Sequence, residues 1–253
     1  MLLKTTGLTK TYTTSGHLIK ALDAVDLSFS ENSFTCIVGK SGCGKTTLLR
    51  LLAGLEPAAA GTITYGNATK IGFVFQEPRL MPWLTVADNI AFAARNDTSL
   101  PKAPSEELLE LLGLKEFRLA YPAQLSGGMA QRAALGRTLF QNPDLILMDE
   151  PFSALDYFTR RSLQQMLLEL FHRQKKSIIF VTHDVEEAIL LADRIVFMIP
   201  HQIYQVIDVN LPKPREYEQI RNDSDFVALR KMLIDLFYEK YKDFSYESAE
   251  AKL

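Results

Sequence analysis

Residues 39–47 read GKSGCGKTT and match the pattern G-x-x-x-x-G-K-[ST]. An apolar run, FTCIV, comes directly before the glycines, and a helical spacing of leucines begins at Lys45. Between a strand and a helix, glycines let backbone N–H groups converge on phosphate, and the helix N-terminus adds a positive dipole. The pattern therefore predicts a phosphate-binding loop; the alternative is a glycine turn with an exposed lysine.

The chemistry of this loop assigns a role to two of its side chains. We expect Lys45 to reach the β- and γ-phosphates of a nucleotide and the Thr46 hydroxyl to bind Mg²⁺. The expected nucleotide contacts from this segment are Gly39, Lys40, Ser41, Gly42, Cys43, Gly44, Lys45, Thr46 and Thr47.

A second chemical group, LILMDEP at residues 145–151, is an apolar run that ends in two adjacent carboxylates. Ligands of open α/β sheets bind at the carboxyl ends of strands, where these side chains would lie. Asp149 suits a Mg²⁺ held through water, and Glu150 suits a general base that activates the attacking water. The alternative is an ordinary strand end with solvated acids, and the phosphate loop upstream argues against it.

The elements around these motifs alternate between strands and helices. Residues 1–38 are rich in strand formers, and residues 61–76 predict a hairpin turning at Gly66 and Asn67, followed by a buried strand. Helices are expected between Thr85 and about residue 137, with one opening near Ser105. Apolar runs followed by helices at residues 144–189 indicate a parallel sheet.

Beyond residue 214 an amphipathic stripe predicts a helix that packs on the body of the protein. Its members are Phe226, Leu229, Leu233, Leu236 and Phe237.

The segment LSGGMAQR at residues 125–132, taken with the two motifs above, resembles the ATP-binding subunits of ABC transporters. Their signature is LSGGQ, and Met129 occupies its last position here. The resemblance extends from about residue 8 to residue 196. It implies an α/β fold: a P-loop NTPase (RecA-like) core, an N-terminal antiparallel β-subdomain and a helical subdomain inserted at about residues 85–137. The ATPase domain would span residues 1–205 and a short helical tail residues 206–253.

The resemblance also implies roles for residues outside the first two motifs. Tyr12 would stack on adenine, although a tyrosine in a strand also packs without a ligand. Gln76 would contact Mg²⁺ and the γ-phosphate, Asp156 in SALD would belong to the D-loop, and His183 in VTHD would contact the γ-phosphate. The implied catalytic set is Glu150, His183, Gln76 and Lys45, and the implied metal set is Thr46, Gln76 and Asp149.

Ser126, Gly127 and Gly128 predict a second helix N-terminus that binds phosphate, with Ser126 as N-cap. In the family two ATP-binding domains dimerise head to tail, so that each signature completes the other subunit's site. The resemblance thus implies a homodimer, or a pair with a homologous ATPase, with ATP and Mg²⁺ at the interface.

Residues 77–92, EPRLMPWLTVADNIAF, resemble the region where importer ATPases receive a helix of the membrane subunit. Met81, Pro82 and Trp83 could line that groove or simply pack within the helical subdomain. With LPKPRE at residues 211–216, the motifs are similar to nitrate/sulfonate/taurine-type importer ATPases. Lys40 departs from this pattern, since proline or a small residue is common there. Partners would be a permease docking near residues 77–90 and, indirectly, an extracytoplasmic substrate-binding protein.

Composition bears on whether the protein binds nucleic acid, spans a membrane or uses its cysteines for a metal. The 253 residues carry a formal net charge of −2, which does not favour nucleic acid as a partner. No apolar run is long enough to span a bilayer, so we expect a peripheral protein at the cytoplasmic face of the membrane. Cys36 and Cys43 lack metal-ligand spacing and are expected to be reduced thiols. The alternatives are a non-transport ABC ATPase of repair, translation or assembly, and the ATPase of an exporter.

Overall fold

The structure, a computed structural model, describes residues 1–14, 16–66, 69–95, 97, 99–174 and 176–242. These residues fall into two compact units. The first takes its residues from Met1–Asn67 and Ile179–Leu253, and the second from Ala68–Ile178.

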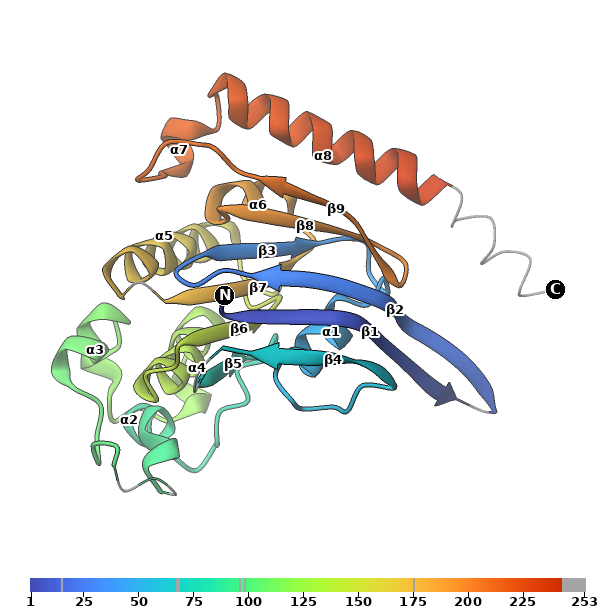
Figure 1. Ribbon diagram of the computed structural model, residues 1–253. Helices are drawn as coiled ribbons and strands as arrows, with labels where there is room; N and C mark the ends of the chain where they lie inside the picture. The colour runs from blue at the N-terminus through green and yellow to red at the C-terminus, as the bar shows by residue number, and fades with distance from the viewer. Residues whose placement is uncertain (15, 67–68, 96, 98, 175, 243–253) are drawn as a thin grey trace. The chain divides into compact units, whose positions relative to one another are not determined.

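The first unit contains an antiparallel sheet with the strand order β2-β1-β4. Its strands are β1 (Leu3–Thr14), β2 (His17–Phe29) and β4 (Ala60–Tyr65), drawn in blue to cyan in Figure 1. Leu3 lies opposite Phe29 on one side and opposite Tyr65 on the other, which sets the register. The expected N-terminal antiparallel β-subdomain is confirmed.

The same unit contains residues 179–182 of β7 together with β3, β8 and β9, in the strand order β7-β3-β8-β9. β3 (Phe34–Val38) and β7 (Ser177–Thr182) are buried along their whole length, as in parallel sheets covered on both faces. β8 (Arg194–Ile199) pairs parallel with β3 and antiparallel with β9 (Gln202–Asp208). α1 (Lys45–Leu52) follows β3, and α6 (Val185–Leu191) follows β7.

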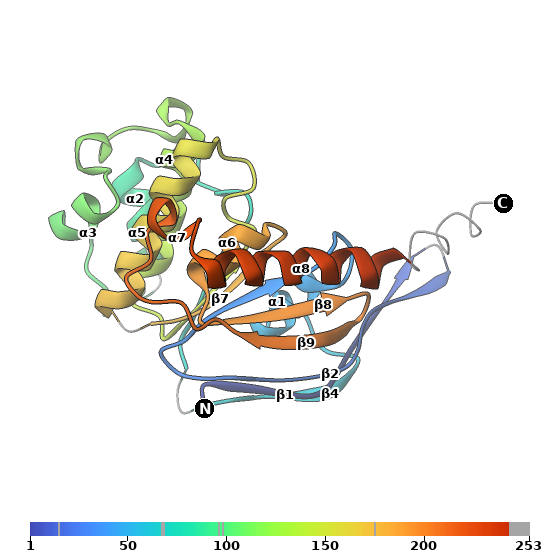
Figure 2. The same cartoon turned by 90° about the horizontal axis from the view of Figure 1, so that it is seen from above.

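The chain then forms α7 (Tyr217–Ile220) and α8 (Ser224–Lys242), and Figure 2 shows α8 running over β8 and β9. Phe226 and Leu233 are fully buried. Phe237 packs edge-on against Phe197 of β8, with ring centroids 4.8 Å apart. The amphipathic helix predicted beyond residue 214 is confirmed.

In the second unit, β5 (Ile71–Val74) and β6 (Leu145–Asp149) pair in parallel, with Ile71 opposite Leu145. Between them lie α2 (Val86–Ile90), α3 (Glu106–Leu111) and α4 (Gly127–Phe140), joined by short 3₁₀ helices at Ala91–Arg95, Lys115–Phe117 and Pro122–Gln124. α5 (Tyr157–Gln174) follows β6. The helices expected after Thr85 are confirmed, with Thr85, Ser105 and Ser126 as N-caps.

Of the hairpin and the following buried strand predicted at residues 61–76, the strand is confirmed as β5, but the hairpin is wrong. β4 pairs with β1, far back in the chain, whereas β5 pairs with β6. Alternating strand formers indicate that a strand exists but do not indicate which other strand it pairs with. Asn67 of the expected turn lies outside the described residues.

Candidate functional site

The predicted phosphate loop lies between β3 and α1, as its sequence context requires. Lys45 is 5% exposed, and its Nζ donates to the carbonyls of Gly39 (2.8 Å) and Lys40 (3.2 Å). The Cys43 N–H also donates to the Lys40 carbonyl, at 3.2 Å, which closes the turn at residues 40–43. The lysine is therefore held over the loop that it is expected to serve.

Gly44 is required at the start of α1. Its φ is 112°, and a Cβ there would lie 2.5 Å from the carbonyl oxygen of Ala21. As the N-cap of α1, Gly44 provides no side-chain hydrogen bond, and a helix N-terminus favours an anion through its N–H groups and dipole. Thr46 lies in the first turn of this helix, where its hydroxyl can reach a cation bound to that anion.

Tyr12 is brought to the phosphate loop. Its hydroxyl lies 3.5 Å from Thr47 Oγ1 and donates to Glu56 Oε2 at 2.6 Å. The Lys10 ammonium lies 5.1 Å from the ring centroid. Burial and the Glu56 hydrogen bond raise the pKa of Tyr12, and the same bond lowers the pKa of Glu56, so the proton stays on the phenol. The ring is thus held at the side of the loop, where an adenine could stack.

His183 follows β7 and is exposed. The turn that carries it is fixed by its neighbours: Thr182 Oγ1 donates to Glu187 Oε2 at 2.5 Å and accepts from the Asp184 N–H at 3.0 Å. Asp184 caps α6 by accepting from the N–H groups of Glu186 and Glu187. The contact between Thr182 and Glu187 was not predicted from the sequence. The only signal for it in the sequence is that a glutamate lies four residues after His183.

In the second unit, the two carboxylates stand at the end of β6 as predicted. Asp149 is the last strand residue and is 7% exposed. Glu150 has φ 44°, a left-handed backbone that costs energy for a residue with a Cβ and that is found mainly at functional sites. The turn after β6 therefore redirects the Glu150 side chain at an energetic cost.

A chain of hydrogen bonds joins Gln76 to this turn. Gln76 Nε2 donates to Ser153 Oγ at 3.1 Å, and Ser153 Oγ donates to the Glu150 carbonyl at 3.0 Å. Ser153 opens the SALD segment, so the predicted Q-loop, D-loop and carboxylate turn are directly linked. The structure thus brings Gln76 and Glu150 together within one unit.

α4 holds the backbone around Gln76 through two side chains that the sequence did not single out. Gln131 Nε2 donates to the Phe75 carbonyl at 3.3 Å. The guanidinium of Arg137 donates to the carbonyls of Pro78 and Arg79, both at 2.9 Å, and burial lowers its pKa. The signature helix therefore fixes both sides of the segment that carries Gln76.

The signature residues form the N-terminus of α4. Ser126 caps the helix by accepting from the Met129 N–H at 3.3 Å. Gly128 packs against α5, because a Cβ there would lie 2.3 Å from Thr159 Cγ2. Asp156 Oδ1 accepts from the Thr159 N–H at 3.1 Å, and hydrogen bonding by the side chain and then the backbone of Thr159 lowers the Asp156 pKa. The carboxylate of Asp156, predicted to serve the nucleotide, thus also caps the start of α5.

The predicted Mg²⁺ ligands are oxygen donors. Within the described ranges, no three His, Cys, Asp or Glu side chains gather to hold a metal ion. Mg²⁺ takes one or two protein oxygens and completes its shell with water and phosphate. Thr46 in the first unit offers a hydroxyl and Asp149 in the second offers a carboxylate, both oxygen donors of the kind that Mg²⁺ prefers.

The predicted docking segment is shaped by Asn89, which is fully buried. Its Oδ1 accepts from the Met81 N–H at 2.7 Å, and its Nδ2 donates to the carbonyls of Met81, Leu84 and Thr85 at 3.0–3.1 Å. With its backbone held in this way, the segment leaves Trp83 67% exposed. Trp83 is therefore no core residue of its unit, whereas Leu84 is buried.

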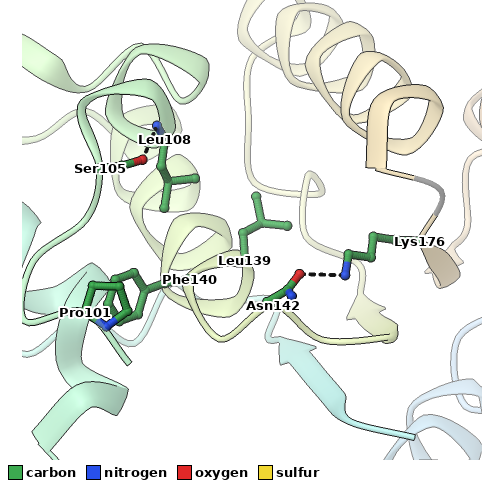
Figure 3. A pocket seen from close by; sticks show the side chains of 7 residues that line it. All are labelled: Pro101, Ser105, Leu108, Leu139, Phe140, Asn142 and Lys176. Carbon is green, nitrogen blue, oxygen red and sulfur yellow. Dashed lines mark hydrogen bonds between the residues drawn. The ribbon is translucent and has the colours of Figure 1, made fainter. Parts of the chain in front are cut away.

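A pocket of about 460 Å³ opens elsewhere in the second unit, beside α3 and the end of α4 (Figure 3). Leu108 and Leu139 line it together with Asn142, whose Oδ1 accepts from Lys176 Nζ at 2.7 Å. None of the predicted site residues lines this pocket.

Comparison with known proteins shows that the chain is similar to ATP-binding proteins of transporters. A family model described as ABC transporter matches residues 22–153. The chain is 44% identical over 225 residues to an aliphatic sulfonates import ATP-binding protein of Burkholderia cenocepacia, covering 85% of this chain and 81% of that one. It is 38% identical over 245 residues to the aliphatic sulfonates import ATP-binding protein of Bacillus subtilis, covering 94% of each.

Further relatives include one without an assigned substrate. An uncharacterized ABC transporter ATP-binding protein of Methanocaldococcus jannaschii is 40% identical over 250 residues, covering 94% of this chain and 92% of that one. Among solved structures, a dimeric ATP-binding cassette in a post-hydrolysis state with ADP and Pi has a TM-score of 0.74 and 31% identity, covering 83% of this chain and 100% of that one. No helix in the part of the chain that the structure describes is long and apolar enough to cross a membrane.

Proposed function

Because this chain belongs to the ABC transporter family, as an ATP-binding subunit of an importer, we propose that its ATPase activity powers the uptake of an aliphatic sulfonate or a similar small anion. The observation that carries the proposal is the likeness to aliphatic sulfonate import proteins over most of the chain, with every motif of the ATPase cycle in place. The same likeness argues against a repair, translation or assembly factor and against an exporter.

In this proposal one group of residues binds the phosphates and Mg²⁺, and another promotes the attack of water on the γ-phosphate. Lys45 would neutralise the β- and γ-phosphates, and Thr46, together with Asp149 through water, would hold a Mg²⁺ ion. Glu150 accepts the proton of the attacking water, and His183 donates to the γ-phosphate. Mg²⁺ supplies charge neutralisation on the phosphates.

Two copies, or one copy and a homologous ATPase, are proposed to enclose ATP between them. The support is the exposed N-terminus of α4 at Ser126 and the dimeric state of a cassette with 31% identity. A helix N-terminus stabilises an anion through its N–H groups and dipole. The signature of one subunit would thus contact the ATP held by Lys45 of the other.

The permease is proposed to dock on the exposed Trp83 and on the neighbouring segment at residues 117–121. Phe117 and Leu119 of that segment are exposed, and the carbonyls of Arg118 and Ala120 accept N–H groups from α2. Exposed apolar side chains of this kind fit the apolar face of an amphipathic helix. This contact would hold the protein at the cytoplasmic face of the membrane, with the substrate-binding protein on the other side of the permease.

Glu150→Gln tests the hydrolytic role. Loss of a general base is expected to slow hydrolysis at least about 100-fold while ATP binding is kept, so that an ATP-bound dimer accumulates in size-exclusion chromatography. Glu107→Gln, an exposed change on α3, is the matched control and should turn over normally. Normal hydrolysis by Glu150→Gln would remove Glu150 from its role.

Ser126→Asp tests the shared interface. Aspartate caps helices as well as serine does, so α4 should stay intact, but its negative charge opposes a phosphate. We expect retained ATP binding by the isolated subunit, an unchanged melting temperature and loss of hydrolysis. Full hydrolysis would contradict an interface in which Ser126 faces ATP.

The substrate is tested in the assembled importer. ATP hydrolysis by the complex with its permease and binding protein should rise when an aliphatic sulfonate is added, and not when a sugar is added. Stimulation by another solute would refute the substrate class while leaving the ATPase role intact. Failure to bind any permease would favour a non-transport ABC ATPase.

A further inference from the structure

The first unit contains a contact between α8 and the phosphate loop. Tyr241 is 7% exposed, and its hydroxyl accepts from the Lys40 backbone N–H at 2.8 Å. The same hydroxyl donates to the Met198 carbonyl of β8 at 2.6 Å. One hydroxyl group therefore ties the second residue of the loop to the strand that neighbours β3.

The tyrosine ring is itself fixed by aromatic neighbours. It stacks on Phe237, with centroids 5.8 Å apart and an interplanar angle of 15°, and meets Phe197 at 6.4 Å. The Lys40 ammonium lies 5.8 Å from the ring centroid. Burial raises the pKa of Tyr241 far above physiological pH, so its hydroxyl keeps the proton that it donates to Met198.

The loop turn at residues 40–43 is held at both ends from outside. Tyr241 binds the N–H of Lys40, and the carbonyl of Cys43 accepts the N–H of His201 at 3.1 Å. Space is also tight, since a Cβ on Gly39 would lie 3.1 Å from the Tyr241 hydroxyl. A loop that is ordered before ATP arrives loses less conformational entropy on binding.

We propose that Tyr241 is a positioning residue that raises ATP affinity by fixing the first turn of the phosphate loop, so that α8 acts on nucleotide binding. The inference rests on the proposed nucleotide site around Lys45. Lys40 makes the contact possible because it has a backbone N–H, which proline at this position would lack.

Tyr241→Phe tests the proposal, since it keeps the ring and removes only the hydroxyl. We expect the Kd and KM for ATP with Mg²⁺ to rise about three- to tenfold, the range for one lost neutral hydrogen bond. We expect kcat within about twofold of wild type, because the contact lies at the loop and not at the attacking water. Tyr238→Phe on the same helix, at a side chain 69% exposed, is the control and should bind ATP normally.

A second measurement follows the loop without nucleotide. The Cys43 sulfur is buried, 2.7 Å from the place of a Gly39 Cβ, and Cys36 is buried in β3. In Tyr241→Phe, a thiol reagent should modify Cys43 several-fold faster than in wild type while Cys36 stays protected. Faster modification of both thiols would mean general unfolding and would overturn the proposal.

Lys45→Ala separates this inference from the proposed function. If Lys45→Ala binds ATP like wild type, the proposed nucleotide site is wrong. If Lys45→Ala loses ATP but Tyr241→Phe keeps the wild-type Kd, only the role of Tyr241 is refuted.

Discussion

Gly128 in the signature has a packing role against α5 and a proposed role in approaching phosphate, and substitutions can separate the two. A Cβ at this position would lie 2.3 Å from Thr159 Cγ2, well inside contact distance, and 3.7 Å from Thr159 Cβ. A Cβ at Gly127 would meet only Leu155, at an ordinary 3.8 Å. Gly128→Ala must therefore push α4 away from α5, at a cost of about 1–3 kcal/mol for overpacking, whereas Gly127→Ala should be nearly neutral for stability.

The magnitude is accessible by thermal unfolding of the nucleotide-free chain. In a domain of this size, 1 kcal/mol shifts Tm by about 2–4 °C, so Gly128→Ala should lower Tm by about 2–12 °C. Thr159→Ser removes the clashing methyl group, and the double variant Gly128→Ala with Thr159→Ser should regain most of the loss.

Hydrolysis should behave differently from stability. If the glycines serve a phosphate through close backbone approach, Gly127→Ala should lose ATPase activity at unchanged Tm, and the double variant should remain impaired after Tm recovers. Full activity of Gly127→Ala, or Tm loss in Gly128→Ala that Thr159→Ser does not relieve, would refute this reading of the interface between α4 and α5.

Three further predictions concern the surrounding supports. Arg215, 2% exposed, donates to the carbonyls of Ala192 and Val209 among others, so Arg215→Met should cost about 2–4 kcal/mol in urea unfolding, against under about 0.5 for the exposed Arg221→Met. Tyr12→Phe should raise the pKa of Glu56, which the Tyr12 hydrogen bond lowers in the folded protein. A lowered carboxyl pKa stabilises the fold above the ordinary pKa, and this stabilisation is lost as pH falls through the pKa of the folded state. The loss of unfolding free energy caused by Tyr12→Phe should therefore shrink below pH 4.5. Arg137→Met should leave ATP binding unchanged but weaken stimulation of the ATPase by the permease.

Local signals in the sequence predict the elements that carry the candidate site. The order of strand, glycine loop and helix at residues 34–52 follows from spacing alone, because all its determinants are neighbours in the chain. Ser105 and Ser126 were recognised as helix starts for the same reason, since an N-cap bonds three residues ahead. The C-terminal helix follows from the periodic spacing of apolar residues such as Phe226 and Leu233, both of which the structure buries.

Non-local supports could not be predicted. Tyr241 bonds to Lys40 across 201 positions, and Arg137 bonds to Pro78 across 59, with no periodicity that links either pair. The mistaken hairpin has the same origin, since hydrophobic alternation specifies a strand and its faces but leaves the pairing partner open.

The distribution of these supports over the two units has a functional consequence. The supports of the phosphate loop described above, from Tyr12 to Tyr241, lie in the first unit. The hydrogen bonds from Gln76 to Glu150, the signature helix and the exposed Trp83 all lie in the second. Substitutions of supports in the first unit should therefore act mainly on ATP affinity, and those in the second on turnover and on its control by the permease. A KM effect from Arg137→Met, or a pure kcat effect from Tyr241→Phe, would break this division.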